Sequence, residues 1–102
     1  DLRGVNFTGV NLDSANMRRA NLSCIEIQDD KERPTGKAWS SNLTSANCAR
    51  ANFADANLQG ANIENTDFQK ASLLRANLID CKVDTAKIQE AILEDAVFKQ
   101  AS

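Results

Sequence analysis

Large apolar side chains recur every five residues along most of this chain. Residues 46–78 read ANCARANFADANLQGANIENTDFQKASLLRANL: a small residue, Asn or a near relative, a large apolar residue, then two mostly polar residues. We call the large apolar residue of each repeat its centre. The centres are Leu2, Phe7, Leu12, Met17, Leu22, Ile27, Leu43, Cys48, Phe53, Leu58, Ile63, Phe68, Leu73, Leu78, Val83, Ile88, Leu93 and Phe98. A fixed short period of this kind is typical of a solenoid.

A period of five suits neither a helix nor a flat strand. On an α-helix five residues advance about 140° net, so the centres would wind around the helix. On a strand five is odd, so successive centres would face opposite sides. A chain that turns a corner every five residues solves both problems, because the small residue and the centre, two apart, then both point inward. Such coils stack at about 4.8 Å and bury a shared core.

The repeat resembles the pentapeptide repeat family, whose motif is A(D/N)LXX, over residues 1–27 and 41–102. The resemblance implies an all-β fold, a right-handed quadrilateral parallel β-helix (solenoid), here of about 4.5 coils with one inserted loop. Four repeats per coil would stack residues twenty apart, giving columns such as Leu43–Ile63–Val83. Before the break the same rule stacks Leu2 on Leu22 and Phe7 on Ile27. We expect one domain over 1–102, taken from a longer chain because Asp1 begins inside the repeat.

Residues 28–40, QDDKERPTGKAWS, interrupt the repeat. Ile27 and Leu43 are sixteen residues apart, one more than three repeats, so we expect a loop that leaves the coil at one corner. One interpretation is a tolerated insertion with Trp39 folded back over the coil. The other is a binding loop with Trp39 as its anchor, because Trp is enriched in binding hot spots.

The repeat erodes towards the C-terminus, where the Asn position becomes Lys82, Lys87, Ile92 and Val97. Residues 86–101 contain strong helix formers, so a capping helix is one alternative. The five-residue phase continues without slipping, which favours a last β-coil. In that case Ile92 and Val97 point outward and form an apolar patch.

The composition offers no catalytic chemistry. The chain has no His and no Tyr, no glycine-rich phosphate loop and no metal-ligand spacing, so we predict no enzyme, no cofactor and no metal site. Cys48 and Cys81 fall on inward positions, as small buried hydrophobes do, whereas Cys24 falls outward and is the expected reactive thiol. Free thiols suggest a reducing compartment, hence a cytoplasmic location. No apolar run is long enough for a membrane span.

We therefore expect a non-catalytic scaffold that presents flat faces and a loop to a protein partner. A net charge of −2 does not favour a nucleic-acid partner, and a coil end offers a route to self-association. The resemblance also admits a DNA-mimicking topoisomerase-binding protein, a structural spacer, or the substrate-recognition half of a BTB-type ubiquitin-ligase adaptor. The candidate partner contacts are Trp39, Arg33, Lys37, Leu74, Ile79, Ile92 and Val97.

Overall fold

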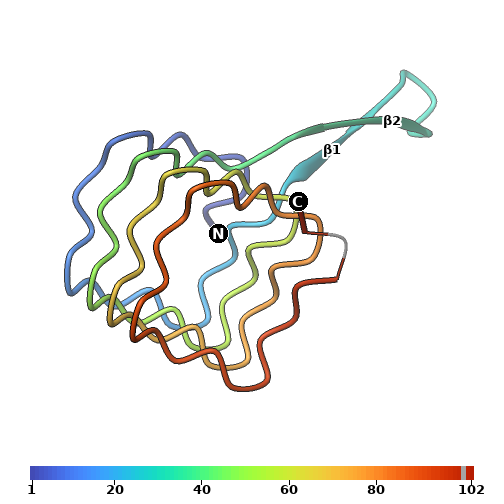
Figure 1. Ribbon diagram of the computed structural model, residues 1–102. Coiled ribbons are helices and arrows are strands. Elements are labelled where there is room, and N and C mark those ends of the chain that lie inside the picture. Colours follow the sequence, from blue (N-terminus) through green and yellow to red (C-terminus); the bar gives the residue numbers. More distant parts are fainter. Residues whose placement is uncertain (100) are drawn as a thin grey trace.

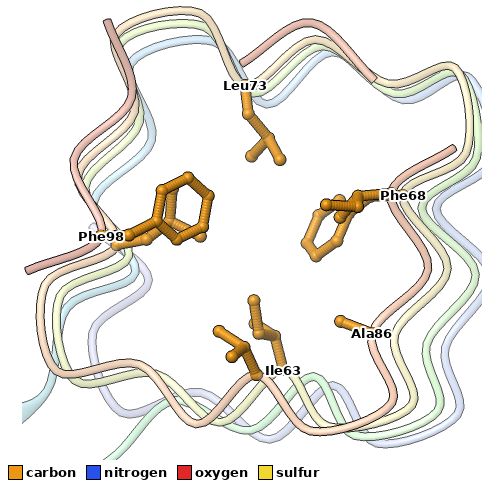
Figure 2. A pocket seen from close by; sticks show the side chains of 8 residues that line it. Ile63, Phe68, Leu73, Ala86 and Phe98 are labelled. Atoms are coloured by element: carbon orange, nitrogen blue, oxygen red, sulfur yellow. The ribbon is translucent and has the colours of Figure 1, made fainter. Parts of the chain in front are cut away.

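The computed structural model describes residues 1–99 and 101–102. Apart from one hairpin, the chain forms a rectangular coil whose successive turns stack in parallel (Figure 1). Each side of a turn meets the next turn through a single bridge, as Asn42 does with Asn62 and Asn62 with Lys82. The twenty-residue spacing of these bridges accommodates four repeats per turn, and Figure 2 shows the four-sided cross-section. The β-helix predicted from the repeat is confirmed.

Among the described residues, most corners are hydrogen-bonded turns that begin at a centre. The N–H of Val10, for example, donates to the carbonyl oxygen of Phe7 at 3.0 Å. The third residue of such a turn has a positive φ, 68° at Gly9 and 59° at Arg50, as a type II turn requires. Most of these positions are not glycine, so non-glycine residues adopt the left-handed conformation at most corners.

The Asn of the repeat stabilises the turn that follows it. Asn52 Oδ1 accepts the N–H of Ala54 at 2.9 Å, and the same bond joins Asn6 to Thr8 and Asn62 to Glu64. Because this bond is local, it explains why Asn is preferred without requiring contact between stacked amides. The last coil, with Lys, Ile and Val at this position, lacks the side-chain oxygen.

Inward residues fill the coil in four columns, one for each side. Phe53 and Phe68 pack edge to face with ring centroids 5.5 Å apart. The columns are Leu2–Leu22–Leu58–Leu78–Phe98, Phe7–Leu43–Ile63–Val83, Leu12–Cys48–Phe68–Ile88 and Met17–Phe53–Leu73–Leu93. Centres from Leu22 to Leu78 within the coil are buried, whereas those of the first and last turns are half-buried or exposed because nothing covers them.

The interruption is a β-hairpin, and its bounds correct the predicted loop of residues 28–40. β1 (Ile25–Gln28) pairs antiparallel with β2 (Pro34–Trp39). Ile27 is therefore not a core centre, and its predicted stacking under Phe7 is wrong. Phe7 N–H instead donates to Asn42 O at 2.6 Å, which places Phe7 over Leu43. The prediction of Leu2 over Leu22 holds, because Leu2 N–H donates to Asn21 O at 2.8 Å.

The C-terminal segment continues the coil. Lys87, Ile92 and Val97 bridge to Asp67, Ser72 and Asn77 of the preceding turn. No helix occurs among residues 1–99 and 101–102, so the last β-coil is confirmed over the capping helix.

A side chain at the Gly60 corner is disfavoured for two reasons. Its φ is +74°, and an added Cβ would lie 2.9 Å from Cys24 Sγ, whereas at Gly9, with φ +68°, a Cβ would meet nothing within 4 Å. We expect Gly9→Ala to cost about 1–2 kcal/mol for left-handed backbone. Gly60→Ala should cost about 1–3 kcal/mol more, because of overpacking.

Urea unfolding of the two variants measures this difference. Adding Cys24→Gly to Gly60→Ala should recover the excess loss. Equal losses for both single variants would contradict the steric part of the explanation.

Candidate interaction surfaces

The hairpin is anchored firmly where it leaves the coil. Ile25 packs over the corner at Gly4, where an added Cβ would lie 3.0 Å from Ile25 Cδ1. The buried Ser41, just after β2, accepts the N–H of Gly4 with its Oγ at 2.9 Å. Figure 1 shows the two strands projecting from this corner, away from the coil.

The tip of the hairpin is also ordered by internal bonds. Asp29 Oδ1 accepts the backbone N–H groups of Lys31 at 2.8 Å and Arg33 at 2.9 Å. Arg33 Nε forms an ion pair with Asp29 Oδ2 at 2.8 Å. The Arg33 N–H bond is the main reason that the pKa of Asp29 lies below its ordinary value. Arg33, one of the predicted contact residues, is thus engaged within the hairpin.

The other hairpin candidates remain open to solvent. Trp39 is 63% exposed at the end of β2, so it is not folded back over the coil. Lys37 is exposed, and none of the ion pairs among the described residues includes it. The sequence interpretation missed Ile25 and Ile27, which lie opposite Trp39 and Lys37 in the hairpin.

A second exposed apolar surface lies on the last coil. Ile92 and Val97 are exposed on its outer sides, and Ile88 and Phe98 are exposed at its open end. A hollow of about 130 Å³ opens there between apolar side chains, several of which Figure 2 shows pointing inward. Leu74 and Ile79, also predicted as contacts, lie on the preceding turn. They are half-buried and therefore less accessible than Ile92 and Val97. The exposed centres follow from the lack of a covering turn.

Charged side chains on the corners pair along the stack. Arg75 Nε lies 2.7 Å from Asp55 Oδ1, and Lys70 Nζ lies 3.9 Å from Glu90 Oε2. The hydrogen bond from Arg75, followed by its charge, lowers the pKa of Asp55 below its ordinary value. The stabilisation from this pair is therefore present above the ordinary pKa and is lost as pH falls through the lower, folded-state pKa. Exposed pairs of this kind contribute little each.

The described residues supply little for chemistry. No group of three potential metal ligands occurs in residues 1–99 and 101–102. Within the same residues there is no helix that is both long and apolar enough to cross a membrane. The hollow in the last coil is lined by apolar side chains without an acid or base.

The three cysteines should differ in reactivity. Burial raises the pKa of the Cys48 thiol to about 12 and that of Cys81 to about 11, so neither forms a thiolate near neutral pH. Cys24 is half-buried at the surface. We expect iodoacetamide at pH 8 to modify Cys24 in the folded protein and all three residues in urea. Peptide mass spectrometry measures this, and modification of Cys48 as fast as Cys24 would contradict the packing.

The chain matches the family model for pentapeptide repeats in eight copies, over residues 1–24 and 46–83. These residues make up more than half of the chain, and the gap between them contains the hairpin. The protein therefore belongs to the pentapeptide repeat family, and the predicted right-handed quadrilateral β-helix is confirmed. No curated protein matches significantly.

The chain is similar to several solved structures of pentapeptide repeat proteins. The pentapeptide repeat protein alr5209 from Nostoc PCC 7120 is 24% identical, with a TM-score of 0.77 over 94% of this chain and 66% of its own. HetL, from Nostoc sp. strain PCC 7120 and involved in heterocyst differentiation regulation, is 27% identical over 100% of this chain and 42% of its own, with a TM-score of 0.47. A protein from the Arabidopsis thaliana thylakoid lumen is 21% identical over 98% of this chain and 62% of its own, with a TM-score of 0.44. This chain spans less than two thirds of the length of each.

Proposed function

We propose that this protein is a non-catalytic scaffold that binds a protein partner through its hairpin. The observation that carries the proposal is the exposed Trp39 on a hairpin that projects from an otherwise regular coil. An exposed tryptophan buries a large area when a partner covers it. Because the root and the tip are held by bonds of their own, little order has to be gained on binding.

The remaining surface supports a scaffold rather than a mimic of a nucleic acid. In one corner column positive side chains alternate with negative ones, as Arg75 does between Asp55 and Asp95. This column is therefore not continuously acidic along the described residues. The apolar residues of the last coil, Ile92 and Val97, form the second candidate contact surface.

A deletion of residues 25–40 tests the proposal. The full chain and the deletion variant are immobilised and exposed to a lysate of the source organism, after circular dichroism has shown that both are folded. We expect a partner that is recovered by the full chain and lost with the hairpin. The double variant Ile92→Asn/Val97→Asn serves as a matched control for the second surface. An identical set of recovered proteins from the full chain and the deletion variant would contradict binding through the hairpin.

A further inference from the structure

The hairpin has one apolar face that contains a single positive charge. The antiparallel register sets Ile25 opposite Trp39 and Ile27 opposite Lys37, and opposed residues share a face of the sheet. Glu26 and Ala38 lie opposite each other on the other face. The apolar face is only partly covered, since Ile25 and Ile27 are half-buried and Trp39 is 63% exposed.

The hairpin also has an open edge. It is a two-stranded sheet, and among the described residues no third strand pairs with β2, all six residues of which are exposed. A two-stranded hairpin is marginally stable by itself, whereas a third strand over an apolar face gives a stable sheet. The structure therefore contains two of the three strands that such a sheet needs.

The direction of the peptide groups on β2 defines what this edge can bind. Lys37 N–H donates to Thr35 Oγ1, which in turn donates to Ile27 O at 2.7 Å, so the Lys37 amide faces β1. The peptide groups alternate along a strand, so the N–H and C=O of Ala38 face the open edge. If a third strand pairs antiparallel with β2 at this edge, Lys37 occupies a non-hydrogen-bonded position. At such positions the side chains of opposed residues approach most closely.

From this geometry we infer that β2 accepts an extended segment of a partner protein that carries Asp or Glu opposite Lys37 and a large apolar residue two positions away, opposite Trp39. Main-chain bonds to Ala38 hold the segment, and the carboxylate pairs with the Lys37 ammonium. The inference rests on the proposed function and names the chemistry of its partner.

The same lysine opposes the pairing of two copies of this chain. Two β2 strands paired antiparallel about a two-fold axis near the strand centre would bring Lys37 close to its own copy, and like charges opposed across strands are destabilising. Pro34 closes the edge at the tip, because it has no N–H to donate. The edge thus selects for an acidic partner strand.

Two matched peptides test the inference, with Trp39 as the probe because it is the only tryptophan in the chain. The first peptide is Thr-Val-Thr-Glu-Thr-Val-Thr, blocked at both ends. It carries Val two positions before and two positions after Glu, so a Val can lie opposite Trp39 in either strand direction. Its control replaces Glu with Lys. We expect a saturable blue shift of Trp39 emission with the Glu peptide. The affinity for the Lys peptide should be lower than that for the Glu peptide by a factor of about five or more.

Two variants of the full chain separate the parts of the explanation. Lys37→Glu should reverse the preference between the peptides, while the Trp39 spectrum without peptide stays unchanged. Ala38→Pro removes the outward N–H and should abolish the response, although Lys37 and Trp39 remain.

Three results would overturn the inference: equal responses to both peptides, no saturable response to either, or a preference unchanged by Lys37→Glu. A concentration-dependent shift without peptide, with dimers seen by light scattering, would show instead that a second copy occupies the edge. If hairpin-dependent partner recovery persists while the peptide result fails, the proposed function stands and only the acidic-strand chemistry is wrong.

Discussion

Phe68→Ala is expected to lower the free energy of unfolding by about 3–5 kcal/mol, the usual loss for a fully buried aromatic ring. Phe68 is completely buried, and its ring packs against Phe53 at 5.5 Å. The walls of the coil are fixed by main-chain bonds on all four sides, so they cannot collapse into the space that the ring leaves. Urea unfolding followed by circular dichroism measures the loss.

Phe98→Ala is the matched control: both rings line the open hollow, but Phe98 is a centre of the last turn and is 38% exposed, whereas Phe68 is fully buried. It should lose less than half as much stability. A similar loss for the two variants would show that the open end is covered in solution, or that the core does not have the packing described above.

Deleting residues 25–40 should leave a folded coil, whereas deleting residues 28–40 should disrupt the N-terminal part of the coil. Leu22 and Leu43 are 21 positions apart. Deleting residues 25–40 removes 16 residues and leaves a spacing of 5, which is one repeat. Deleting residues 28–40 removes 13 residues and leaves a spacing of 8, which is not a multiple of the repeat. The first deletion joins Cys24 to Ser41, and the sequence then reads ANLSC-SNLTS in unbroken phase. The second puts the inward residues of the next repeats on the wrong side of the wall.

Thermal unfolding and size-exclusion chromatography of the two variants measure this contrast. In the shorter chain Cys24 takes a corner position where Gly4 and Gly60 have positive φ, so Cys24→Gly should stabilise the deletion variant further. If the 25–40 deletion unfolds while the 28–40 deletion remains native-like, the assigned phase is wrong.

The repeat could be predicted from sequence because each of its positions has a distinct physical task. Small and large inward residues, an Asn that bonds the following turn and two corner residues recur every five residues, a pattern that neither a helix nor a flat strand can bury on one face. The same phase correctly placed Ile88, Leu93 and Phe98 on a last coil, although the local propensity of residues 86–101 favours a helix. Stacking against the preceding turn outweighs that propensity.

The start of the hairpin could not be predicted for an equally physical reason. Ile25-Glu26-Ile27 alternates apolar, polar and apolar, and so does one side of the coil, where the residues two apart both point inward. Three residues of a strand and three residues of a repeat therefore look alike. The one available signal was an insertion length that is not a multiple of five. The open edge of β2 had no signal in the sequence, because it depends on what the fold leaves beside it.

The place of the hairpin also affects the order in which the coil forms. Turns after it pair residues twenty apart, as in Asn42 with Asn62, whereas the first turn pairs Asn6 with Asn42 across 36 residues. Closing the longer loop costs about 0.5 kcal/mol more in chain entropy. The first turn also packs against the others on one side only. We therefore expect folding to nucleate within residues 41–80 and the N-terminal turn to dock last, so that within the coil amide hydrogen exchange is faster in residues 1–24 than in residues 41–80.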